Sequence, residues 1–100
     1  MRIQFLILAL VAIAGCTQPG NVDVAKEECI KLCQEALARG ENLENGPCLS
    51  NRVIEGWVCD VAHSPRQDVD NRPENQCPEF GKSASHFVEV DPNCRFIRSY

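Results

Sequence analysis

The clearest hydrophobic pattern in the chain lies between residues 22 and 39. Apolar side chains recur there at spacings of three and four residues, which places them on one face of a helix. These positions are Val22, Ala25, Cys29, Leu32, Cys33 and Ala36. Asn21 or Asp23 is placed to cap the first turn, and Gly40 provides a left-handed stop after Arg39. The pattern predicts one amphipathic helix.

An alternating pattern follows within residues 53–62 and predicts a strand. Trp57, Cys59 and Val61 share one face by alternation, while Val58 lies on the other. Gly56 is expected to mark a bulge in this strand. A Trp flanked by valines in a strand belongs more often to a core than to a binding surface.

Residues 87–90 and 94–97 have the pattern of a hairpin, and the sequence Asp-Pro-Asn at 91–93 joins them. Together these elements predict an α+β fold. One N-terminal helix is expected to pack on a small antiparallel sheet of about three strands, held together by disulfides.

The N-terminal segment has the pattern of an export signal. Arg2 supplies a positive charge, and residues 3–14 are apolar apart from Gln4. That run is too short to span a bilayer as a helix, which takes about 20 residues, but it suits a signal peptide. We therefore expect residues 1–15 to be removed, residues 16–21 to form a tether and residues 22–100 to form the domain.

Residues 13–16 read Ile-Ala-Gly-Cys and resemble a lipobox, in which the Cys thiol receives a diacylglyceryl group. The alternative is ordinary secretory cleavage after Ala14. The chain has seven Cys, and an odd number in an exported protein requires a special fate for one of them. Lipid on Cys16 leaves six, which can form three disulfides. The alternative leaves Cys16 free or bridging two chains.

The remaining cysteines are Cys29, Cys33, Cys48, Cys59, Cys77 and Cys94. Cys29 and Cys33 lie four residues apart on the predicted helix, so their Cβ atoms are about 5–6 Å apart. A disulfide needs about 3.5–4.5 Å, so these two should not pair. Our preferred pairing joins Cys29 or Cys33 to Cys59, and Cys77 to Cys94, although other pairings stay open.

A long polar segment, residues 63–76, fits neither a helix nor a strand. Loops of this length are uncommon in compact domains and are often functional. The candidate binding residues on it are His63, Arg66, Asp68, Asp70, Arg72 and Glu74. They are consistent with a binding loop, with a weak calcium site, with an inhibitor loop that presents Arg66 to a protease, or with a solvated acidic loop.

The charge balance and the histidines narrow the possible activities. Asp and Glu number 14 against 10 Lys and Arg, which argues against nucleic acid and against anionic lipid head groups as partners. Thiols with His63 and His86 offer a metal or redox alternative, but exported thiols oxidise and no Cys-x-x-Cys is present. His63 with Ser64 does not predict catalysis, because no acid is evidently placed to orient His63. We expect no enzyme activity, no cofactor and no metal.

Four stretches carry a resemblance to other proteins: GPCLS at 46–50, WVCDVAHSPR at 57–66, DNRPENQC at 70–77 and HFVEVD at 86–91. Over residues 26–100 the chain resembles a group of small, cysteine-rich exported archaeal proteins with no assigned function. The resemblance implies a prokaryotic envelope setting and no activity.

Together these patterns predict an extracytoplasmic domain, anchored by lipid on Cys16 to the cell membrane or an outer membrane. Its role is expected to be non-catalytic, either structural or the binding of an envelope protein or a small ligand. The alternatives are an inhibitor of an extracellular hydrolase acting through residues 63–76, and a metal-binding or redox protein.

Overall fold

The computed structural model describes residues 20–100. The predicted signal peptide, Cys16 and most of the predicted tether lie outside the described residues. Helix α1 (Asn21–Ala38) closely matches the predicted helix, and Gly40 with φ 82° ends it as expected. The predicted side-chain caps are wrong. The helix begins one residue earlier, so Gly20 is the N-cap and its carbonyl accepts the N–H groups of Asp23 and Val24.

The sheet has four strands rather than about three, and it is mixed rather than antiparallel. The strands are β1 (Cys48–Ile54), β2 (Trp57–Val61), β3 (His86–Val90) and β4 (Phe96–Ser99), which lie in the order β1-β2-β3-β4. The α+β class is confirmed. Strand β1 escaped prediction because its sequence, CLSNRVI, lacks a regular alternation of apolar and polar side chains.

The central pair of strands, β2 and β3, is parallel, with Trp57 opposite His86 and Val61 opposite Val90. Parallel neighbours require a long connection between them. Here the connection is residues 62–85, which include the long polar segment and two short 3₁₀ turns, η3 (Asp68–Asn71) and η4 (Pro73–Asn75). Alternation shows which side chains share a face but not the direction of a neighbouring strand, so the sequence pattern did not reveal this pairing.

The two outer pairs are antiparallel. Gly56, with φ 83°, lies in the turn between β1 and β2 rather than in a bulge, and the register shifts of that pair lie along β1. The predicted hairpin near the C-terminus is confirmed, but β4 begins at Phe96. Cys94 has φ 68° and belongs to the turn, where its N–H donates to the carbonyl of Asp91.

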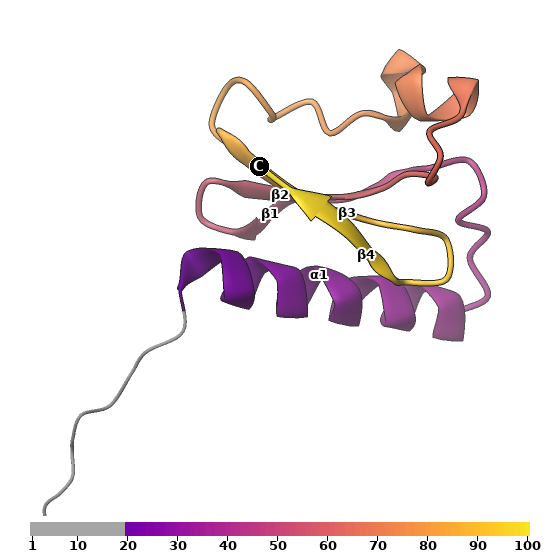
Figure 1. Ribbon diagram of the computed structural model, residues 1–100, viewed down its shortest axis with the longest axis horizontal. Coiled ribbons are helices and arrows are strands. Elements are labelled where there is room, and N and C mark those ends of the chain that lie inside the picture. Colours follow the sequence, from indigo (N-terminus) through magenta and orange to yellow (C-terminus); the bar gives the residue numbers. More distant parts are fainter. Residues whose placement is uncertain (1–19) are drawn as a thin grey trace, which may run out of the picture.

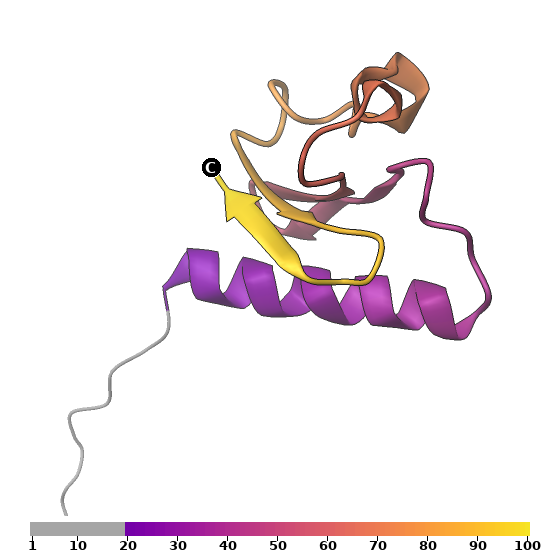
Figure 2. The same ribbon diagram turned by 45° about the vertical axis from the view of Figure 1, so that its right-hand side comes forward.

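Helix α1 lies along one face of the sheet, and the connection between β2 and β3 crosses the other side (Figure 1). Turning the molecule shows the same layers (Figure 2). The main core lies between the helix and the sheet. Its sheet side chains include Trp57, Cys59, Val61, Val88 and Val90. The predicted face of Trp57, Cys59 and Val61 is therefore the core face.

Three disulfides cross-link these layers. Cys29–Cys59 joins α1 to β2, Cys33–Cys94 joins α1 to the β3–β4 turn, and Cys48–Cys77 joins β1 to the connection on the opposite face. The preference for Cys59 as a helix partner is confirmed, and Cys29 does not pair with Cys33. The Cys77–Cys94 preference is wrong, because these residues lie on opposite sides of the sheet.

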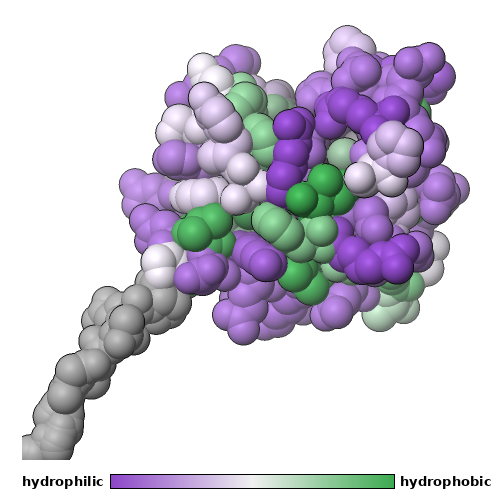
Figure 3. Space-filling view, viewed as in Figure 1, coloured by the Kyte–Doolittle hydropathy of each residue, from purple (hydrophilic) through white to green (hydrophobic). Residues whose placement is uncertain are grey.

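The surface over residues 63–76 is mostly hydrophilic (Figure 3). Apolar side chains gather nearer the centre of the same view. Within residues 20–100, α1 is the one long helix, and it does not have the continuous apolar length needed to cross a membrane.

Candidate ligand-binding site

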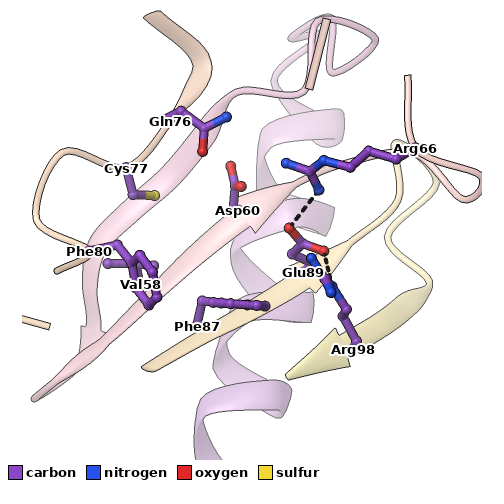
Figure 4. Close-up of a pocket in the computed structure, with 9 residues that line it drawn as sticks. All are labelled: Val58, Asp60, Arg66, Gln76, Cys77, Phe80, Phe87, Glu89 and Arg98. Atoms are coloured by element: carbon purple, nitrogen blue, oxygen red, sulfur yellow. Dashed lines mark hydrogen bonds and ion pairs between the residues drawn. The ribbon is translucent and has the colours of Figure 1, made fainter. Parts of the chain in front are cut away.

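A pocket of about 310 Å³ lies on the sheet face opposite α1. Strand alternation creates it, because the residues between the core positions of β2 and β3 point away from the helix. Val58 and Asp60 come from β2, Phe87 and Glu89 from β3, and Arg98 from β4 (Figure 4).

The connection between β2 and β3 supplies the opposite wall of this pocket. Gln76 and Cys77 border it, Phe80 closes one end, and Arg66 reaches over the other end (Figure 4). The Cys48–Cys77 disulfide holds this wall against β1. The volume is at the lower end of the range typical of small-molecule sites, about 300–1,000 Å³.

Glu89 is a buried carboxylate with both oxygens engaged. Its exposed fraction is 5%. Oε2 accepts a hydrogen bond from Arg66 at 3.1 Å, and Oε1 accepts one from Nε of Arg98 at 2.8 Å. Such charge-assisted bonds hold the Glu89 side chain in place. Glu89 therefore positions the two arginines, and each of its carboxylate oxygens is bonded to one of them.

Asp60 lies beside Glu89 across the parallel pair, but its surroundings differ. It is 8% exposed, and its Oδ1 atom has no hydrogen-bond partner among the described residues. Burial, and secondarily the negative charge of Glu89, raise the pKa of Asp60 to about 8, although Arg66 acts in the opposite direction. Asp60 is therefore mainly a neutral acid at neutral pH. A buried polar atom left without a partner costs about 1–3 kcal/mol.

The other end of the pocket is aromatic. The rings of Phe80 and Phe87 meet edge to face with centroids 5.4 Å apart, and Tyr100 stacks on Phe87 at 5.6 Å. The Arg98 guanidinium lies 5.3 Å from the Phe87 centroid. The pocket thus combines one buried acid, two arginines committed to Glu89, and an apolar aromatic end.

Asp70 holds the connection against the rest of the domain. It is 2% exposed, and its Oδ2 atom accepts the backbone N–H groups of His63 and Gln67, each at 2.9 Å. Burial alone would raise the pKa of Asp70, but these bonds and the His63 ring lower it. A Cβ atom on Gly46 would lie 2.6 Å from Oδ1 of Asp70, so glycine is needed there for close approach.

The sequence did not identify an acid that orients His63, but the structure provides one. Nδ1 of His63 lies 2.9 Å from Oδ1 of Asp70, and Nε2 lies 3.5 Å from Glu44. The bond to Asp70 is the main reason that the pKa of His63 is raised. Ser64, the candidate nucleophile, is exposed, and no hydrogen bond joins it to His63 among the described residues.

The six candidate residues of the polar segment therefore separate into two groups. His63, Arg66 and Asp70 make inward contacts, and of these only Arg66 lines the pocket. Asp68, Arg72 and Glu74 are exposed. The calcium arrangement is not formed, because Asp70 binds backbone N–H groups and the Asn71 side-chain oxygen accepts from Arg66.

Sequence reasoning missed Asp60, Glu89 and Arg98 as site residues. A usable signal existed, since Asp60 and Glu89 each interrupt an otherwise apolar strand. Buried carboxylates of that kind are rare unless they are paired or functional. What the sequence did not show is that the two strands are neighbours.

Metal ligation finds little support in the geometry. All six cysteines within residues 20–100 form disulfides, and no group of three or more His, Cys, Asp or Glu side chains in that range is placed to hold a metal ion. His86, the other candidate ligand, stacks on Trp57 with ring centroids 4.6 Å apart.

Comparisons of the chain with protein-family models, with curated proteins and with solved structures found no match.

Proposed function

We propose that this chain is a lipid-anchored, extracytoplasmic domain that binds a small ligand in the pocket around Asp60 without transforming it. The observation that carries the proposal is the buried Asp60 carboxyl, whose Oδ1 atom has no partner within a preformed cavity. Buried polar groups are normally hydrogen-bonded, so a partner supplied by a ligand accounts for the exception.

The disulfides support the extracytoplasmic setting. Three disulfides in so small a domain are typical of oxidising compartments. They also use all the cysteines of the described residues, so Cys16 has no partner among them. That pairing supports lipid on Cys16, in the setting that the resemblance to exported archaeal proteins implies.

The carboxyl pair favours binding over catalysis. Acid–base reactions commonly need one group to donate a proton and another to accept it. Asp60 is placed to donate, but both oxygens of Glu89 are occupied by arginines. The pocket therefore has no second free carboxylate to act as a base.

The contacts of Arg66 favour the binding role over inhibition of a hydrolase. Its guanidinium donates to Asn71, to Glu89 and to the backbone carbonyl of Asp70, at 2.8, 3.1 and 3.2 Å. An inhibitor loop would need this side chain to extend into a protease pocket. Here extension would break all three bonds and leave Glu89 with one arginine.

A fragment screen by NMR tests the proposal on the intact oxidised protein. We expect hits to shift the signals of Val58, Asp60 and Gln76. Val58→Phe places a ring in the pocket and should remove the shifts at Asp60 and Gln76. Val22→Phe adds the same bulk at an exposed position on α1 and should leave them. Hits that avoid the pocket, or that survive Val58→Phe in a folded protein, would contradict the proposal.

A further inference from the structure

The unpartnered atom of Asp60 indicates what kind of group the pocket lacks. Oδ1 is buried and accepts no hydrogen bond from the described residues. Asp60 points from β2 into the space between Gln76 and Arg66 (Figure 4). A ligand that donates a hydrogen bond at this point would satisfy the ionised carboxyl, whereas the neutral acid would itself donate to an acceptor. Donors are carried by amines, alcohols and amides, so charge must decide among them.

The charges that face Asp60 come from three elements. Glu89 on β3 and Asp70 in the connection favour a positive partner, while Arg66 in the connection opposes one. Arg98 on β4 lines the same pocket, with its Nε on Glu89. Two of the three charged groups that act on Asp60, Glu89 and Asp70, are negative, so the charges nearest the carboxyl favour a cation.

When no other cation is bound, a proton takes that place. Burial disfavours a lone carboxylate, and Glu89 adds to this, so the pKa of Asp60 rises to about 8. A positively charged ligand beside Asp60 would form a neutral pair with the ionised carboxylate. The pKa of Asp60 would then fall, and the carboxyl would lose its proton. An anionic ligand would instead require Asp60 to remain protonated.

The remainder of the pocket suits an apolar body. Val58, Phe80 and Phe87 line the end away from Arg66 (Figure 4). Phe80 is 41% exposed although its ring contacts Phe87, so apolar surface is available for a ligand to cover. Aromatic rings also attract cations.

We infer that the pocket binds a compact organic cation, a protonated amine on a small apolar body, whose ammonium group donates to Asp60. The inference rests on the proposed binding function and names its ligand class. In the exchange, the O–H bond of the Asp60 carboxyl breaks and its proton goes to solvent. The ammonium N–H then donates to the carboxylate, so the ammonium group takes the place of the proton.

Calorimetry on the intact oxidised protein tests this exchange with three probes of similar shape: phenethylamine, phenylethanol and hydrocinnamate. Phenethylamine stays protonated below about pH 9, as lysine does. We expect it to bind most tightly of the three and to release up to about one proton per site below pH 8. Its affinity should rise by up to about tenfold per pH unit from pH 6 and level off above pH 8.

Asp60→Asn should weaken phenethylamine binding by at least about tenfold and abolish both the proton release and the pH dependence. Asp68→Asn removes a carboxylate from an exposed position outside the pocket and should bind like wild type. Because Asp60→Asn could disturb folding, the wild-type Asp60 carboxyl carbon is also followed by NMR. Its signal should move from the protonated to the ionised position when phenethylamine is added at pH 6.5.

Two results would overturn the inference. Phenethylamine binding without proton release, or no binding, excludes Asp60 as its counter-ion. Tighter binding of hydrocinnamate or phenylethanol, with shifts at Val58 and Gln76 and weakening as the pH rises, would assign the pocket to an acid or a neutral ligand. In that case the proposed binding function stands and only the ligand class is wrong. If the fragment screen also leaves the pocket empty, both fail.

Discussion

Two buried aspartates show how local surroundings assign different tasks to the same side chain. Asp70 accepts two backbone N–H groups and a histidine ring, and its pKa is lowered. Asp60 keeps one oxygen without a partner, and burial raises its pKa to about 8. Asp70 thus stabilises the connection between β2 and β3. Asp60 is held at a cost to stability, which is typical of functional groups.

That cost predicts a pH dependence of folding. Asp60 has its ordinary pKa of 3.8 when unfolded and about 8 when folded, so the unfolded chain loses the proton first as the pH rises. Stability should therefore fall from about pH 4 to pH 8, by at most about 1.4 kcal/mol per pH unit from this group. Above pH 8 both states are ionised and the cost is constant.

Asp60→Asn removes this contribution. Urea unfolding across the same pH range should show the variant gaining stability relative to wild type as the pH rises. Asp68→Asn is the matched control, and its curve should run parallel to wild type. An Asp60→Asn curve that also runs parallel would mean that the folded state does not hold a proton on Asp60.

Among the elements, the disulfides divide into two functions. Cys29–Cys59 and Cys33–Cys94 attach α1 to the sheet, and they do so from the two helix positions that are too far apart to pair with each other. Cys48–Cys77 lies on the other face and fixes the wall of the pocket. The first two stabilise the core, and the third shapes the site.

Removing one bridge of each kind should separate these roles. Cys33→Ala/Cys94→Ala opens a cross-link of sequence separation 61 and should lower the free energy of unfolding by about 2–5 kcal/mol. NMR signals of Val58 and Gln76 should stay nearly unchanged. Cys48→Ala/Cys77→Ala removes a bridge of shorter separation, 29, so it should cost less stability but shift those signals. The reverse pattern would contradict the assignment.

In the whole molecule, the pocket and α1 lie on opposite faces of the sheet, and α1 follows the predicted tether. Four residues, 17–20, separate Cys16 from the start of α1 at Asn21, and the five steps between these two residues span at most about 17 Å. A lipid on Cys16 would therefore hold the start of α1 close to the membrane surface. The pocket lies on the opposite face of the sheet from α1 (Figure 4), where a soluble ligand can reach it if the helix side faces the membrane.

The anchor is testable on protein extracted from membranes of its native host. We expect the intact mass of residues 16–100 with one diacylglyceryl group and six hydrogens fewer than the reduced chain, because three disulfides are present. Cys16→Ser should release the protein from the membrane without altering the disulfides. A lipid-free native mass that begins at Gly15, or thiols that alkylate without reduction, would contradict the anchored form.

Local patterns were sufficient for much of the fold. Helix α1 follows from apolar spacing, and its ends lie within a residue of the predicted ones. Alternation placed Trp57, Cys59 and Val61 on the core face. Helix geometry excluded a Cys29–Cys33 bridge, and Cys59 is indeed bonded to one of that pair. Each of these inferences depends on neighbours along the chain, whose relative positions are set by the repeat of the element.

The sequence by itself determined the helix, the α+β class and the exclusion of a Cys29–Cys33 bridge. The tertiary structure decided that β2 and β3 are parallel, that Cys77 meets Cys48, and that Asp60 lies beside Glu89. The site depends on the second group, since Asp60 and Glu89 are separated by the whole connection in sequence and become neighbours only through strand pairing. Alternation specifies the face of a side chain, but strand order and direction arise from packing the entire chain around one core.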